Sequence, residues 1–178
     1  MRWLDIPPNQ VWILPALIYV VRKKLKGNAP ALEDFNAFIA HTKTIPAADP
    51  AILEKFSGLD VGEQQLLAIF VDDTHDCSRF VTGDKRALKL IAELAALDPN
   101  LNQKLHGHVD SLEGILLGLI ERFGFDSVND KVSQCLGIDK VFSVAFGAKR
   151  TKDSATDALT SYLSDLRRTA PFVVNRGT

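Results

Sequence analysis

Two carboxylates, Glu63 and Asp84, stand where an acid could do chemistry. Glu63 lies just inside the start of an apolar-periodic helix, and Asp84 follows the short β-rich run 80–82 at the turn into the next helix. Crossover units bring strand ends and helix starts to one edge of a sheet, where α/β proteins bind ligands. Two acids there suit a hard divalent cation, because Mg²⁺ prefers oxygen ligands and commonly takes one or two carboxylates plus waters. The pair therefore predicts a metal site.

Both acids also have a purely structural interpretation as part of a helix start. Asp60 precedes Glu63 by three residues, an offset that suits reciprocal capping. Asp84 can cap the helix that follows it, and a cap of this kind contributes about 0.5–2 kcal/mol to stability. The two interpretations stay open here, and the strand–helix setting of the pair favours the metal site.

The gross composition indicates a globular protein with a core of its own. The chain has 178 residues, of which 46% are hydrophobic and 24% are charged, and this suits a single globular domain. The net charge of −1 excludes a global basic field that would attract nucleic acid. A local basic cluster is typical of a solvated helix end and consists of Arg22, Lys23, Lys24 and Lys26.

The hydrophobic pattern predicts many helices and a few short strands. Strands are expected at 11–14, 80–82 and 172–174. Helices are expected at 16–26, from residue 30 or 31, at 50–56, from residue 61, and at 85–97, 112–123, 127–136 and 151–168. The expected helix caps are Asp49, Asp60, and either Asp110 or Ser111. The helix from residue 61 is expected to bury a stripe formed by Leu66, Leu67, Phe70 and Val71. The stretch after Asp98 is expected to be a polar connection that leads to the helix at 112–123.

Three sequence segments resemble one branch of the PIN-domain family of metal-dependent ribonucleases. The first is the Gly62-Glu63 helix start, followed after a gap by F-V-T-G-D-K-R-A. The early segment I-L-P-A-L-I-Y-V-V-R-K-K-L is similar to the branch's strand, proline and helix. The later L-H-G-H-V-D-S-L-E-G-I-L-L-G-L-I-E-R-F-G is similar to its glycine-containing apolar helix. The resemblance covers about 11–124, with its specific core at 62–87.

The resemblance implies a three-layer α/β sandwich with a short parallel sheet and many helices. It also implies one PIN-like domain over 1–178, with 125–178 as a C-terminal helical extension packed on it. Acids at the strand ends would hold Mg²⁺ or Mn²⁺ and hydrolyse single-stranded RNA. Glu63 and Asp84 would be catalytic metal ligands, and Thr82 and Lys85 would orient the scissile phosphate. Asp139 is a third candidate ligand, because some members of the family place an acid late in the chain.

The N-terminal region departs from the family pattern. The family's first acid follows the first strand, whereas the only early acid here is Asp5, with Pro7 and Pro8 close behind it. The chain is therefore interpreted either as an N-terminally truncated piece or as a degenerate member. The degenerate form would bind nucleic acid or a protein without cutting. A further alternative is a helical interaction domain with an oligomer interface at 112–123.

The expected partners and location follow from the same observations. RNA is the expected partner of an active enzyme, with a small antitoxin or a second copy as alternatives, since toxin-like members of the family often pair with an antitoxin. The apolar run 11–21 is too short to span a bilayer and contains Pro15, so no membrane is expected. Cys77 and Cys135 match no metal spacing and suit a reducing compartment, which together with no visible signal peptide predicts a cytoplasmic location.

Overall fold

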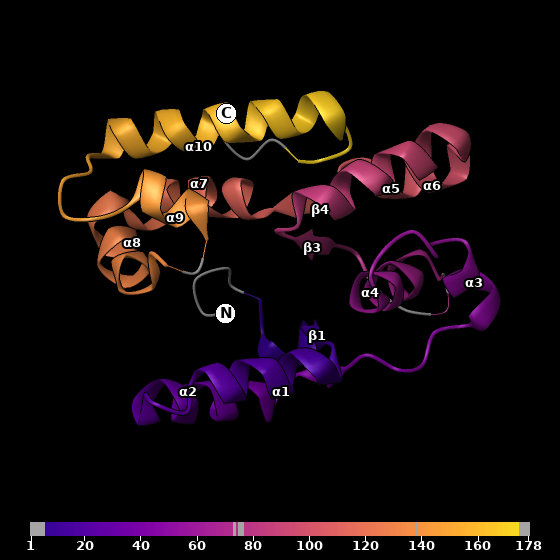
Figure 1. The fold of residues 1–178 in the computed structure, drawn as a ribbon, viewed down its shortest axis with the longest axis horizontal. Helices are drawn as coiled ribbons and strands as arrows, with labels where there is room; N and C mark the ends of the chain where they lie inside the picture. Colours follow the sequence, from indigo (N-terminus) through magenta and orange to yellow (C-terminus); the bar gives the residue numbers. More distant parts are fainter. Residues whose placement is uncertain (1–5, 73, 75–76, 138, 175–178) are drawn as a thin grey trace. The chain divides into compact units, whose positions relative to one another are not determined.

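The computed structural model describes residues 6–72, 74, 77–137 and 139–174 (Figure 1). The chain divides into two compact units, with the boundary between Cys77 and Ser78. Among the described residues, each unit is mixed α/β, is mostly helical and contains one short parallel sheet of two strands. The predicted α/β class with parallel strands and many helices is confirmed at this level. The three-layer sandwich stays a prediction.

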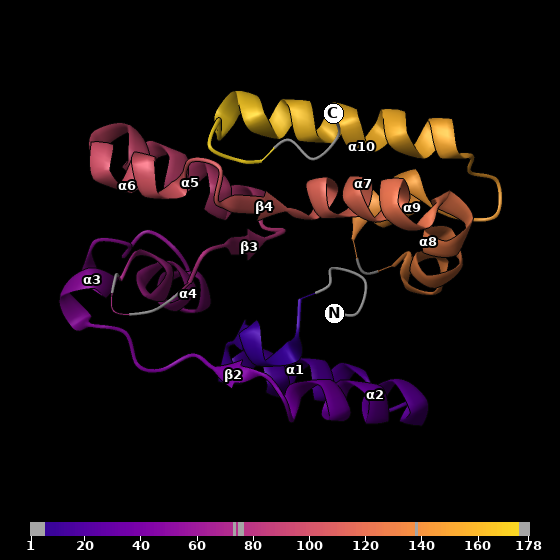
Figure 2. The same ribbon diagram turned by 180° about the vertical axis from the view of Figure 1, so that it is seen from behind.

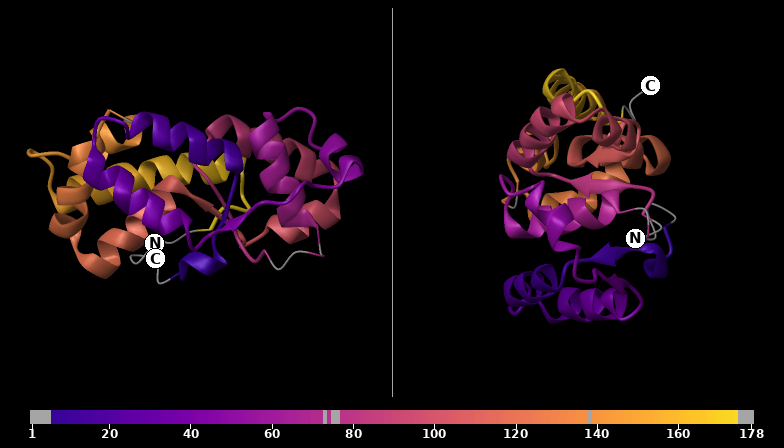
Figure 3. Two further views of the ribbon diagram at one scale, coloured as in Figure 1. Left: turned by 90° about the horizontal axis from the view of Figure 1, so that it is seen from below. Right: turned by 90° about the vertical axis from the view of Figure 1, so that its right-hand side faces the viewer.

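The first unit contains a parallel strand pair joined by a helical hairpin. Its elements are η2 (Pro8–Gln10), β1 (Trp12–Ile13), α1 (Pro15–Lys24), α2 (Ala29–Ile39), β2 (Lys43–Thr44), α3 (Pro50–Glu54) and α4 (Val61–Val71). Strands β1 and β2 pair in parallel, and α1 and α2 lie side by side between them in the chain (Figure 3). Pro15 opens α1 because its fixed φ and missing N–H suit a first helical turn.

Helix α4 begins as predicted, but its buried face differs from the expected one. The Asp60 carboxylate accepts a hydrogen bond from the Glu63 amide at 2.9 Å, which confirms Asp60 as the cap. The expected core stripe at Leu66, Leu67, Phe70 and Val71 is buried only in part. The buried residues are Leu67, Ala68, Ile69 and Phe70. The helix ends in six consecutive apolar residues, so its sequence pattern does not indicate which face is buried.

The second unit alternates strands and helices before it ends in a helical segment. Its elements are β3 (Phe80–Thr82), α5 (Lys85–Leu97), α6 (Pro99–Leu105), β4 (Val109–Ser111), α7 (Leu112–Phe123), α8 (Phe125–Val132), η3 (Ser133–Cys135), α9 (Lys140–Ala145) and α10 (Lys152–Thr169). β3 and α5 have the predicted bounds. The predicted extension 125–178 contains α8, η3, α9 and α10, which belong to the same unit as β3 and β4.

The sheet of the second unit depends on a strand that the sequence pattern missed. β3 and β4 pair in parallel, with Thr82 opposite Ser111, and Val173 adds a single parallel bridge to Val109. The expected polar connection before α7 therefore contains both α6 and β4. α6 was missed because the Asp98-Pro99 pair is typical of a helix end, whereas in the structure Asp98 caps α6. β4 was missed because Asp110 interrupts its apolar pattern.

Helix α10 covers the apolar face of α7. It runs along α7 and packs on α9, a relationship that Figures 1 and 2 show from opposite sides. Leu116 and Ile120 of α7 and Leu159 and Leu163 of α10 are all buried. The chain itself therefore covers much of the helix to which the interaction-domain alternative assigned an oligomer interface, and that alternative stays a prediction. None of the helices in the described part of the chain combines the length and apolar character needed to cross a membrane.

Candidate functional site

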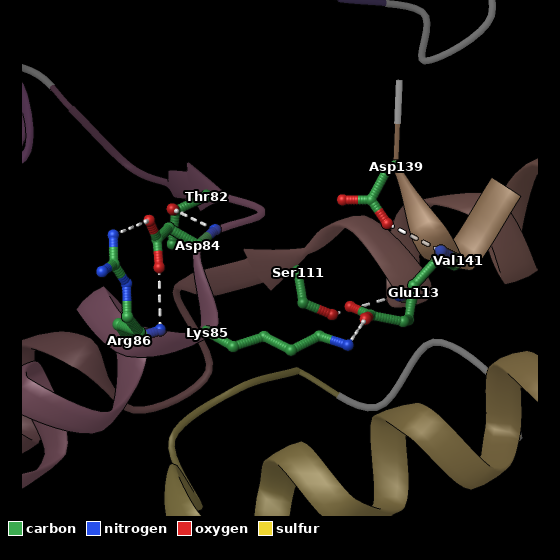
Figure 4. A network of polar contacts seen from close by, with 9 residues as sticks. Thr82, Asp84, Lys85, Arg86, Ser111, Glu113, Asp139 and Val141 are labelled. Atoms are coloured by element: carbon green, nitrogen blue, oxygen red, sulfur yellow. Dashed lines mark hydrogen bonds and ion pairs between the residues drawn. The ribbon is translucent and has the colours of Figure 1, made fainter. Parts of the chain in front are cut away.

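Polar side chains gather at the carboxyl edge of the β3–β4 sheet. Thr82 and Ser111 form the last pair of the parallel ladder, and each strand leads directly into a helix. Asp84 follows Thr82 by two residues, and Glu113 follows Ser111 by two residues, so the two acids occupy equivalent positions at one edge (Figure 4). This is the edge at which α/β folds bind ligands.

Asp84 is the N-cap of α5, which confirms its structural interpretation. Its Oδ1 accepts hydrogen bonds from the amides of Arg86 at 2.8 Å and Ala87 at 3.2 Å. Its Oδ2 lies 3.9 Å from Nη2 of Arg86, and the side chain remains 38% exposed. Capping uses one oxygen of the carboxylate, so the other can still bind a cation.

Thr82 shapes the turn between β3 and α5. Its hydroxyl accepts a hydrogen bond from the Asp84 amide at 3.1 Å, and the side chain is half-buried. The predicted substrate contact of Thr82 stays a prediction. What the hydroxyl does in the structure is to hold Asp84 in its capping conformation.

Lys85 is held by two residues that sequence reasoning did not single out. Its Nζ lies 3.0 Å from Oε1 of Glu113, which is 2% exposed, and 4.4 Å from the centre of the Tyr162 ring. Ser111 is fully buried and caps α7 by accepting a hydrogen bond from the Gly114 amide at 3.2 Å. The available signal for Glu113 was an acid in the first turn of a helix that stays apolar from Ile115 to Ile120 apart from one glycine.

Asp139 is the N-cap of α9. Its carboxylate accepts a hydrogen bond from the Val141 amide at 2.7 Å, and Asp139 is half-buried. The apolar run after it forms α9, and this helix packs on α10 and η3. Its role as a metal ligand stays a prediction.

Glu63 belongs to the first unit, whereas the other four candidate residues belong to the second. It lies in the first turn of α4, and its amide donates to the cap Asp60. A Cβ on Gly62 would lie 3.3 Å from Cδ1 of Leu14, so the start of α4 packs closely against the residue that follows β1. Glu63 and Asp84 thus each lie near the carboxyl end of a strand, but in different units.

The described residues contain no group of three or more His, Cys, Asp and Glu side chains arranged to hold a metal ion. Asp84 nevertheless supplies an exposed carboxylate oxygen of the kind that Mg²⁺ takes in proteins, with water completing the shell of the ion. Comparison of the chain with models of protein families, with curated proteins and with solved structures gave no match.

Proposed function

We propose that the chain is a metal-dependent ribonuclease of the PIN type, with a three-layer α/β fold, that hydrolyses phosphodiester bonds of single-stranded RNA in the cytoplasm. The main support is the setting of Asp84, a half-exposed carboxylate at the carboxyl edge of a parallel sheet with Lys85 beside it. Glu63 and Asp139 stay predicted metal ligands, as the sequence indicates.

The residues at this edge suit the recognition of a phosphodiester. No backbone amide of the described residues donates to Oδ2 of Asp84, so this oxygen can bind Mg²⁺ or Mn²⁺, while Thr82 fixes the turn that presents it. Lys85 supplies a cation for a phosphate oxygen. A bound metal ion would lower the pKa of a coordinated water and stabilise charge on the phosphate.

A second candidate is a catalytically degenerate PIN-like protein that binds RNA, or a protein such as a small antitoxin, without cleavage. The capping contacts of Asp84 and Asp139 favour it, because each carboxylate already has a structural function. The lack of a three-ligand group among the described side chains points the same way.

Cleavage of a mixed single-stranded RNA in Mn²⁺ or Mg²⁺ tests the first proposal. The informative variants are Asp84→Asn and Glu63→Gln, each of which removes one charge. Asp98→Asn is the matched control, because Asp98 caps α6 with hydrogen bonds of 2.9 and 3.2 Å that closely match those of Asp84. Asparagine is itself a good N-cap, so the two Asp→Asn variants should keep their folds.

Metal-dependent cleavage that is lost in Asp84→Asn and Glu63→Gln but kept in Asp98→Asn would support the nuclease. Cleavage that survives Asp84→Asn would show that the carboxyl edge of the β3–β4 sheet is not part of the active site. RNA binding without any cleavage in either metal would favour the degenerate protein.

A further inference from the structure

We propose that Glu113 and Tyr162 are positioning residues, which hold the ammonium of Lys85 at the carboxyl edge of the β3–β4 sheet to bind a phosphate of RNA. The proposal rests on the function proposed above and concerns how its substrate is held. Lys85 lies in α5, Glu113 in α7 and Tyr162 in α10, so three helices converge on one ammonium group. Figure 4 shows the Lys85 side chain reaching across to Glu113.

The ammonium of Lys85 is fixed although the side chain is 47% exposed. A half-exposed lysine ordinarily samples many rotamers, and ordering it has an entropic cost. Here Nζ is bound to a buried carboxylate at 3.0 Å and lies over an aromatic ring at 4.4 Å. An ammonium has three N–H donors, and the ring attracts the cation without a hydrogen bond, so donors remain for a phosphate.

The position of Lys85 in its helix is unfavourable without a compensating partner. Lys85 and Arg86 both lie in the first turn of α5, which contains no acid, and the helix dipole disfavours cations there. Glu113 lies in the first turn of α7, where the dipole favours a carboxylate. The ion pair thus keeps a cation at the sheet edge, next to Asp84.

The alternative is that Lys85 only neutralises a buried carboxylate. The effect of Glu113→Gln on RNA affinity separates the two roles by its sign. Removing a negative charge beside a phosphate site should tighten RNA binding if Glu113 has no positioning role. If Glu113 holds the ammonium in place, the same change should weaken binding severalfold in spite of the more favourable charge.

The experiment measures the Kd of a short fluorescein-labelled single-stranded RNA by anisotropy, in EDTA so that the RNA is not cut. Lys85→Met is expected to weaken binding roughly tenfold, as the loss of one charge-assisted hydrogen bond implies. It should also reduce the slope of log Kd against log salt by about 0.7, the value for one lost contact with a single strand. Tyr162→Leu should weaken binding, whereas Tyr162→Phe, which keeps the ring, should not.

Lys89→Met is the matched control for the loss of charge. Lys89 lies one turn further along α5 and pairs with Glu93 at 4.0 Å on the exposed surface. Its removal changes the net charge as Lys85→Met does, but it touches neither Glu113 nor the sheet edge. It is expected to change Kd much less than Lys85→Met.

Thermal melting of every variant checks that a change in RNA affinity is not caused by unfolding of the protein. Lys85→Met leaves Glu113 charged and without its ion pair, so the double variant Lys85→Met/Glu113→Gln removes both charges together. That double variant should fold as the wild type does and bind RNA as weakly as Lys85→Met.

Weaker binding by folded Glu113→Gln, with Lys89→Met close to wild type, supports the proposal. Equal or tighter binding by Glu113→Gln overturns it, and so does a wild-type protein that binds no RNA. Cleavage is scored separately in Mg²⁺: if the binding pattern holds without cleavage, the positioning role stands and the nuclease proposal fails.

Discussion

Arg79 and Asp110 form a two-point ion pair at the start of the β3–β4 ladder. Nε of Arg79 lies 2.6 Å from Oδ2 of Asp110, and Nη2 lies 3.1 Å from Oδ1. Asp110 is a buried residue in the middle of β4, and Arg79 directly precedes β3. Bidentate guanidinium–carboxylate pairs are directional as well as strong, so this pair helps to fix the register of the two strands.

Replacing Arg79 by Met should lower the free energy of unfolding by about 2 kcal/mol. Breaking a fully buried pair typically costs about 3–5 kcal/mol, and solvent reduces this value because Arg79 is 35% exposed. Urea denaturation measures the loss. Arg86→Met is the control, since Arg86 is 92% exposed and lies 3.9 Å from its acid, and it should change stability too little to measure. Equal losses in the two variants would contradict the prediction.

Asp84→Ala should lower the free energy of unfolding by about 1 kcal/mol, because it removes the acceptor of two amide hydrogen bonds at the start of α5. Asp84→Asn should change stability by much less, because asparagine caps nearly as well. Chemical denaturation of both variants checks this difference. If alanine and asparagine have the same effect, capping is not what Asp84 contributes to the fold.

Leu159→Ala should destabilise the second unit by about 2–5 kcal/mol, because this fully buried side chain of α10 would leave a cavity. The measurement is the midpoint of urea unfolding, followed in the second unit. Leu97→Ala is the control, since Leu97 is 84% exposed and should be tolerated. A tolerated Leu159→Ala would mean that α10 does not contribute to the core beneath it.

Mg²⁺ or Mn²⁺ should raise the Tm of the wild-type protein, and EDTA should reverse the rise. A ligand present at 100 times its Kd stabilises the folded state by about 2.7 kcal/mol. The shift should disappear in Asp84→Asn and persist in Asp98→Asn, because Asp84 lies at the sheet edge whereas Asp98 caps α6. An unchanged shift in Asp84→Asn would place the bound ion elsewhere.

Local sequence signals were sufficient for elements that depend on neighbouring residues. The bounds of β3 and α5 agree with prediction, and Asp49, Asp60 and Ser111 cap helices through hydrogen bonds to amides two or three residues away. A helix start needs only a side-chain acceptor and a following periodic run, so the chain encodes it within a few residues. The candidate acids Asp84 and Asp139 also cap the helices that follow them.

Tertiary structure alone decided which residues meet at the sheet edge. β4 is a strand because it pairs with β3 across a long crossover, and its polar Asp110 is tolerated because Arg79 satisfies it. The role of Glu113 also depends on a distant contact, because this buried carboxylate pairs with Lys85, which lies 28 positions earlier in the chain. The sequence by itself determined the caps, most helices and an acid after β3. Contacts between distant segments determined which side chains lie near that acid at the sheet edge, since pairing across long loops leaves no local periodic pattern.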